Sequence, residues 1–215
     1  MDENEVEIIN KETRKEKIKN FLINKKKTII STVILFILIL FSFFFYQDYT
    51  QNQRELLANK YNAAIIEYES GDKSKILDSM KNIIINKDKT YSPLAFYYLL
   101  DNDLITSKEE INKYFDILIY EVGLNDESKN LTIFKKGLFN SEFANENELL
   151  DILNPIIKSE SIWKPHALYL MAEYYFAKKE KQKSKEFLEQ LISLENINQK
   201  VKLEAQKRLR SDFSE

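Results

Sequence analysis

The chain contains no cysteine, three glycines, three prolines and one histidine in 215 residues. The absence of cysteine excludes disulfides, thiol nucleophiles and thiolate metal sites. The scarcity of glycine and proline disfavours a turn-rich all-β fold and the glycine-rich loops of nucleotide-binding enzymes. The same scarcity favours long helices joined by short turns.

No pattern of residues indicates an enzyme. The sequence has no G-x-x-x-x-G-K, no G-x-G-x-x-G and no zinc-ligand spacing. His166 follows Pro165, so we expect it in the first turn of a helix as a partly exposed polar residue. The acidic pairs Glu109–Glu110 and Glu67/Glu69 have the context of solvated helix faces and caps. We therefore predict no catalytic residue, no cofactor and no metal site.

Residues 28–46 are 19 consecutive residues without a charge, a glycine or a proline. As a helix they would reach about 28 Å, which matches the hydrocarbon thickness of a bilayer. A cleaved signal peptide would usually have a shorter apolar stretch followed by small residues, whereas this run ends in the bulky residues 43–46. The run therefore predicts a permanent transmembrane helix.

The charges on the two sides of this run predict its orientation. Residues 1–27 carry eight Lys and Arg against six acids, with the basic residues toward the membrane. Short lysine-rich flanks stay on the cytoplasmic side. By subtraction from the totals of 32 and 34, residues 47–215 hold 24 basic and 28 acidic side chains, which disfavours nucleic-acid binding. We predict a cytoplasmic tail (1–27), a transmembrane helix (28–46) ending near the belt residues Tyr46 and Tyr49, and a periplasmic domain (47–215) in a bacterial inner membrane.

Apolar residues recur at helical spacing along the rest of the chain, and no stretch alternates with period two. The fold class is therefore all-α. The expected helices cover 50–69 (ended by Gly71), 76–84, about 92–101, 107–123, 126–138, 146–158, 163–177, 181–194 and 197–211. The third should bury Leu94, Phe96, Tyr97 and Leu100. Ser107 and Glu110 form a capping-box pattern, and Pro155 should kink or break its helix.

Turns near residues 71, 104, 142 and 179 recur every 33 to 38 residues. This period is typical of a tetratricopeptide-like array, in which each helical hairpin buries its apolar face against its neighbours. In the best unit, ALYLMAEYYFAKKEKQKSKEFLEQLISLEN, the small residues Ala172 and Ser184 would let two helix backbones approach closely. No glycine follows the first helix of this unit, and the other units match less well. The array is therefore degenerate.

The anchor with KKK before it, YNAAIIEYESGD, and SIWKPHALYLMAEYYFAKKEKQKSKEFLEQLI together resemble a family of Gram-negative bacterial proteins. Members have a short basic tail, one anchor and a tetratricopeptide-like periplasmic domain, and they include the ancillary subunit of the Sec translocon. The resemblance implies a membrane-tethered interaction protein at the export machinery. Its partners would be translocon subunits, exported chains or periplasmic chaperones.

Aromatic side chains supply the candidate binding residues. FYYLL (96–100) and YLMAEYYF (169–176) place aromatics on more than one helix face. Most of them should be core, and the remainder would line a groove for an apolar peptide. The candidates are Tyr97, Tyr98, Tyr174 and Tyr175. We expect Trp163 to act as a hydrophobic staple before its helix rather than as a binding anchor.

Two classes of function remain open at this point. The leading hypothesis is a protein-interaction module at the Sec translocon, as the resemblance implies. The alternative is a structural scaffold in envelope assembly or cell division, in which the domain forms homo-oligomers. The basic segment from Arg14 to Lys27 would also attract anionic lipid headgroups.

Overall fold

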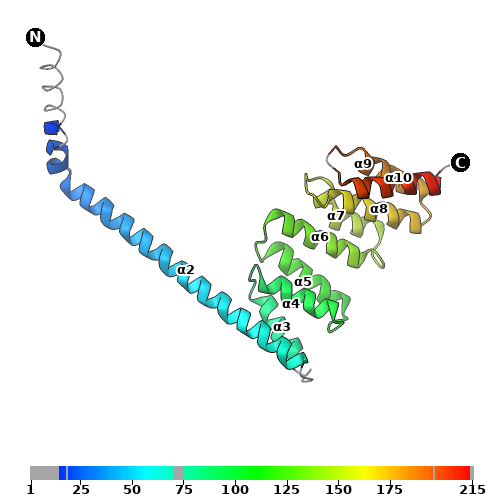
Figure 1. The fold of residues 1–215 in the computed structure, drawn as a ribbon, viewed down its shortest axis with the longest axis horizontal. Helices are drawn as coiled ribbons and strands as arrows, with labels where there is room; N and C mark the ends of the chain where they lie inside the picture. The colour runs from blue at the N-terminus through cyan, green and yellow to red at the C-terminus, as the bar shows by residue number, and fades with distance from the viewer. Residues whose placement is uncertain (1–14, 18, 70–74, 196, 214–215) are drawn as a thin grey trace, which may run out of the picture. The chain divides into compact units, whose positions relative to one another are not determined.

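The computed structural model describes residues 15–17, 19–69, 75–195 and 197–213. Within these ranges all regular structure is helical, which confirms the all-α prediction. The expected helix end at Gly71 lies outside the described residues. The helices are α2 (Lys26–Glu69), α3 (Ile76–Ile85), α4 (Tyr91–Asp101), α5 (Lys108–Tyr120), α6 (Asp126–Asn140), α7 (Glu146–Ile157), α8 (Lys164–Ala177), α9 (Lys181–Ile192) and α10 (Gln199–Phe213), shown in Figure 1.

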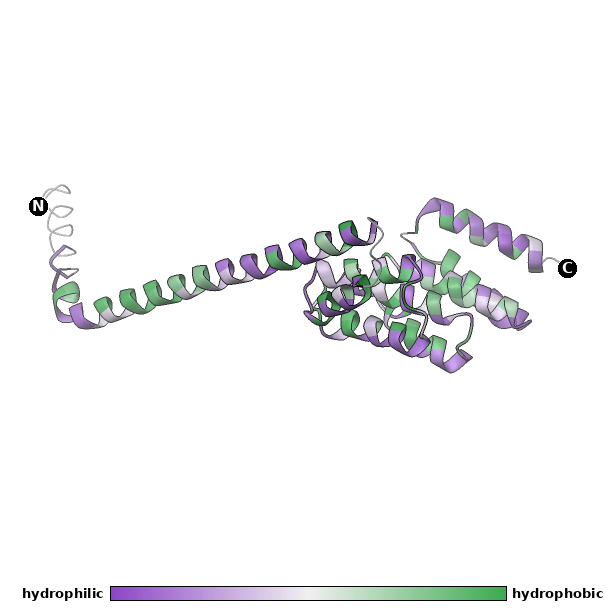
Figure 2. Ribbon diagram, turned by 90° about the horizontal axis from the view of Figure 1, so that it is seen from below, coloured by the Kyte–Doolittle hydropathy of each residue, from purple (hydrophilic) through white to green (hydrophobic). Residues whose placement is uncertain are grey.

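The chain divides into two compact units, Met1–Leu56 and Leu57–Glu215. The first contains the apolar part of α2, coloured green along its length in Figure 2. No side chain of residues 28–46 is buried. Since α2 runs unbroken over 44 residues, the predicted anchor and the helix expected after it are one continuous helix. Within the described residues, α2 is long and apolar enough to cross a membrane.

The second unit is a sequential array of helices, in which each helix from α3 to α10 packs on the next (Figure 1). Contacts also join α3 to α5, α6 to α8 and α8 to α10. The connections at 102–107, 141–145 and 178–180 match the turns expected near 104, 142 and 179. The helices α4/α5, α6/α7 and α8/α9 are therefore helical hairpins, each joined by a short turn.

The predicted close approach of α8 and α9 is confirmed. Ala172 and Ser184 are each 1% exposed, and the Ser184 hydroxyl donates a hydrogen bond of 2.8 Å to the Ala172 carbonyl. Lys179 follows α8 with a left-handed backbone (φ 65°), where glycine is the usual residue. Its N–H donates to the Phe176 carbonyl (2.9 Å), so the turn closes without a glycine.

The face that α4 buries differs from the prediction. Leu94 is 44% exposed, whereas Ala95, Phe96 and Leu99 are fully buried. Tyr97 and Leu100 are half-buried. The segment is apolar almost all round, so its periodicity could not select the inward face. Contacts with the neighbouring helices orient α4 instead. Ser92 is buried, and its hydroxyl donates a hydrogen bond to the Ile83 carbonyl on α3 (3.0 Å).

Two local predictions are corrected in detail. Ser107 caps α5 by accepting from the Glu110 N–H, but the Glu110 carboxylate binds Lys81 on α3 (2.6 Å), so that capping box is only half formed. A complete capping box occurs instead at α7, between Asn145 and Glu148. Pro155 does not break α7, which continues to Ile157. A proline in the last turn removes only one helical hydrogen bond.

Candidate functional site

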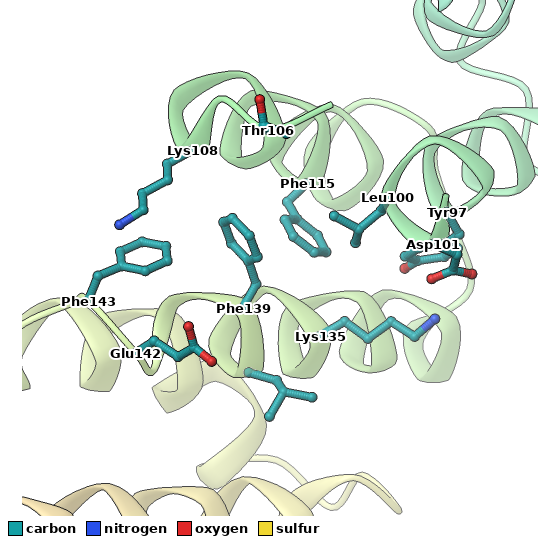
Figure 3. A pocket seen from close by; sticks show the side chains of 11 residues that line it. Tyr97, Leu100, Asp101, Thr106, Lys108, Phe115, Lys135, Phe139, Glu142 and Phe143 are labelled. Carbon is teal, nitrogen blue, oxygen red and sulfur yellow. The ribbon is translucent and has the colours of Figure 1, made fainter. Parts of the chain in front are cut away.

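The strongest candidate for a binding site is a hollow between the α4/α5 hairpin and α6 (Figure 3). We call it the aromatic hollow, and its volume is about 640 Å³. It is lined by Tyr97, Leu100, Asp101, Thr106, Lys108, Phe115, Lys135, Leu138, Phe139, Glu142 and Phe143. This volume lies within the range of roughly 300–1,000 Å³ that is typical of ligand pockets.

The inner wall of the aromatic hollow is a chain of phenylalanine rings. Phe115 is fully buried and lies 4.8 Å from the buried Phe96 ring. Phe139 lies 6.1 Å from Phe115 and 5.2 Å from Phe143 between ring centroids. The first and last of these contacts are edge-to-face and the Phe115–Phe139 contact is tilted. Such arrangements are preferred by aromatic pairs. The hollow therefore offers a pre-formed apolar wall, beside which Leu138 is 52% exposed.

Two lysines extend over aromatic rings at opposite ends of this hollow (Figure 3). The Lys108 ammonium lies 3.8 Å from the Phe143 ring centroid, and the Lys135 ammonium lies 3.6 Å from that of Tyr97. Burial lowers the pKa of Lys135, and the Asp101 carboxylate opposes this effect. Cation–π contacts at these distances stabilise an ammonium by about 0.5–2 kcal/mol, depending on its desolvation.

The hollow lies where two helices meet through side chains only: the Tyr97 hydroxyl of α4 donates a hydrogen bond of 3.4 Å to the Thr132 hydroxyl of α6. Among the described residues, the backbones of α4 and α6 make no close contact, whereas α6 contacts α8 and α8 contacts α10. The two hairpins are joined through α5 and α6 instead. Asn112 and Asn140 exchange side-chain amide hydrogen bonds of 3.1 and 2.8 Å. Lys136 also forms an ion pair with Asp116 (2.6 Å).

A second hollow of about 560 Å³ lies among α6, α8 and α10. It is lined by Phe134, Leu138, His166, Tyr169, Leu170, Glu173, Asn198, Lys200, Val201 and Glu204. His166 is in the first turn of α8, as expected, and is half-buried against the rings of Phe134 and Trp163. Its Nδ1 is buried without a hydrogen-bond partner among the described residues. Since Leu138 lines both hollows, they adjoin each other.

The four predicted binding tyrosines have different environments. Tyr97 lines the aromatic hollow, and Tyr98 packs against Tyr61 and Tyr68 of α2, with ring centroids 6.4 and 6.1 Å away. Tyr174 and Tyr175 are 7% and 2% exposed.

The hydroxyls of the two buried tyrosines already have partners. That of Tyr174 donates to the Ala144 carbonyl (3.1 Å), and that of Tyr175 donates to the Glu146 carboxylate (2.8 Å). Both side chains are therefore core residues in this structure rather than groove residues. They lie in an aromatic stretch whose sequence could not show which face is open.

Trp163 does not simply precede its helix. It occupies the N-cap position of α8, and its ring is stacked on Phe134 of α6 at 5.9 Å. The lysines of the aromatic hollow were not predicted, because a cation–π contact between separate helices leaves no local pattern. Phe139 and Phe143, four residues apart, were a signal that sequence reasoning could have used.

Two carboxylates form ion pairs between separate helices, and these pairs predict how the stability of the fold depends on pH. The Lys81 ammonium, bonded to Glu110, lowers the pKa of that carboxyl below its ordinary value of 4.5, and the Lys183 ammonium does the same for Glu146. A carboxylate whose pKa is lower in the folded than in the unfolded state stabilises the fold at pH values above its unfolded-state pKa. This stabilisation is lost as the pH falls through its folded-state pKa. We expect the thermal midpoint to fall as the pH drops below 4.5.

The matched test is the double variant Glu110→Gln/Glu146→Gln. It should be less stable than the wild type at pH 7 and should show a smaller loss on acidification, as measured by circular dichroism melting. Glu142→Gln changes an exposed carboxylate and serves as the control. An equal flattening of the pH dependence by this control would contradict the role of the two pairs.

Among the described residues, no group of three or more His, Asp or Glu side chains is arranged to hold a metal ion. The chemical character of the site is thus an apolar aromatic surface with ammonium groups at its ends. In comparisons with known proteins, no family model, no curated protein and no solved structure matches this chain.

Proposed function

We propose that this protein is a membrane-anchored protein-interaction module at the Sec translocon of a Gram-negative bacterium. Its helical array would bind translocon subunits, exported chains or periplasmic chaperones. The observation that carries the interaction role is the aromatic hollow, which presents a pre-formed phenylalanine wall and the exposed Leu138 on a helical array. Concave, mostly apolar surfaces of this kind are typical of sites that bind other molecules.

The apolar run and its flanking charges support the proposed location. The apolar run 28–46 of α2, preceded by Lys25, Lys26 and Lys27, supports an anchor whose N-terminus is cytoplasmic and whose array is periplasmic. We propose the translocon as the location because the layout of the chain resembles the family that includes the ancillary subunit of the Sec translocon. Membrane location and partner identity are therefore tested separately.

Photo-crosslinking from the hollow tests the interaction role. A photoreactive phenylalanine replaces Leu138, which is 52% exposed beside the hollow, and the full-length protein is irradiated in native membranes. We expect adducts with translocon subunits, exported chains or periplasmic chaperones. The control replaces Tyr120, which is 72% exposed and outside the hollow, and should give few of these adducts. Equal labelling from both positions, or none from Leu138, would argue against the hollow as the binding surface.

Protease protection tests the orientation. A protease added to intact spheroplasts should digest the array and leave the basic tail before Lys25 protected. Digestion of the tail with protection of the array would reverse the topology and remove the export role.

A further inference from the structure

The cations of the array differ in their partners. Most of those that lie between helices form ion pairs: Lys81 with Glu110, Lys87 with Glu121, Lys136 with Asp116, Lys183 with Glu146 and Arg208 with Glu173. Within the described part of the chain, Lys108 and Lys135 have no carboxylate at ion-pair distance and lie instead over aromatic rings. The contrast is sharpest between Lys135 and Lys136, which are adjacent in sequence.

Of the two lysines, Lys135 is placed to attract a partner's carboxylate more strongly. Its side chain is half-buried, so much of the cost of removing water from its ammonium has already been met by folding. A carboxylate from a partner would therefore gain more from Lys135 than from a fully hydrated surface lysine. Lys108 is exposed, but its contact with Phe143 keeps its ammonium at the other end of the hollow.

The hollow also has two acidic side chains, Asp101 and Glu142. Both residues are exposed. Exposed carboxylates gain little from pairing with a partner's cation, because that pairing replaces favourable contacts with water. The exposed Lys108 gains equally little from a partner's carboxylate, so the half-buried Lys135 decides the balance. The balance of the two charges thus favours a partner that brings negative charge toward the lysines rather than positive charge toward Asp101 and Glu142.

Between the two ammonium groups lies the apolar wall, in which the half-buried Leu100 and Phe139 are accessible beside the fully buried Phe115 (Figure 3). A partner must fill this part with a large apolar side chain to gain from desolvation. In an extended segment, residues two apart point to the same side of the chain. An apolar residue with an acidic residue two positions before and after it would therefore present all three side chains to the hollow together.

On these grounds we propose that the aromatic hollow binds an extended segment of a partner polypeptide in which an aromatic residue is flanked by carboxylates, with the aromatic ring on the phenylalanine wall and the carboxylates at Lys108 and Lys135. This inference rests on the proposed function and specifies the kind of segment that the module recognises.

The test uses full-length protein in lipid nanodiscs and short fluorescent peptides with the core Asp-Ser-Phe-Ser-Asp, measured by anisotropy. Two matched peptides replace both Asp by Lys, or Phe by Ala. We expect the acidic aromatic peptide to bind about tenfold more tightly than the lysine peptide, the difference that two exposed or half-buried ion pairs can supply. It should also bind about tenfold more tightly than the alanine peptide, which loses the apolar burial of the aromatic ring. Added salt should weaken its binding.

Variants then assign the effect to the hollow. Lys108→Gln/Lys135→Gln should weaken binding of the acidic peptide by about tenfold and abolish its advantage over the lysine peptide. Lys178→Gln removes a lysine that also lies over an aromatic ring, Tyr174, but outside the hollow, and should leave binding unchanged. Thermal midpoints equal to that of the wild type show that the variants fold.

Failure of this inference is distinguishable from failure of the proposed function. Equal binding of the acidic and basic peptides, no binding of any peptide, or an unchanged affinity in the double variant would overturn the inference. If crosslinks from Leu138 still capture partners in membranes, the interaction role stands and only the recognised chemistry is wrong. If the acidic peptide binds as expected but no partner is captured, the recognition stands and the translocon role fails.

Discussion

Replacing Phe96 by alanine is expected to lower the free energy of unfolding by about 3–5 kcal/mol. The side chain is fully buried, and its ring lies 4.8 Å from Phe115 and 5.9 Å from Tyr114. Truncation removes these contacts and leaves a cavity at the centre of the α4/α5 hairpin. Guanidinium unfolding of the full-length protein in detergent, followed by the fluorescence of the single tryptophan, measures the loss.

The matched control is Leu94→Ala, two residues earlier on the same helix. Leu94 is 44% exposed, so its truncation should change the free energy of unfolding by less than about 1 kcal/mol. The sequence alone predicted both residues to be buried, and the pair therefore tests the orientation of α4 directly. A comparable loss for Leu94→Ala would mean that α4 is turned differently, and Tyr97 and Leu100 would then no longer line the aromatic hollow.

Replacing Gly137 by valine is expected to destabilise the protein by about 1–3 kcal/mol. A Cβ atom at this position would lie 2.9 Å from Leu153 Cγ and closer still to its Cδ2. Leu153 is fully buried on α7, so it has little space in which to move away. Glycine inside a helix normally costs about 1 kcal/mol of stability relative to alanine. At Gly137 we infer that the close packing of α6 and α7 offsets this cost.

A double-mutant cycle identifies the source of this effect. In a Leu153→Ala background the obstructing side chain is gone, and Gly137→Val should then cost much less than in the wild type. Thermal or guanidinium unfolding of the four proteins measures the coupling. An equal cost in both backgrounds would show that the clash with Leu153 is not the cause. Because Leu138 and Phe139 follow Gly137 on α6, the same packing also positions one side of the hollow.

Much of the architecture could be predicted from local patterns. The uninterrupted apolar run predicted one long helix, and α2 continues through it to Glu69. In the expected helix 107–123, the apolar residues Ile111, Phe115 and Leu118 recur at helical spacing, and all three are at most 2% exposed. The small residues Ala172 and Ser184 predicted the close packing of α8 and α9. These features depend on helical spacing and side-chain size, which can be recognised from the order of residues.

Other features were decided only by tertiary contacts. The stretches around Tyr97 and Tyr174 are apolar on several faces, so the helices packed against them determined which aromatics became core. The lysines of the hollow lie over rings 35 and 38 positions away, at Phe143 and Tyr97. Such contacts depend on how two hairpins are stacked, and the hollow lies where the backbones of α4 and α6 stay apart. Local residue patterns therefore predict the helices and their hairpins, whereas the stacking of the hairpins forms the aromatic hollow, because a gap between helix backbones has no local signature in the sequence.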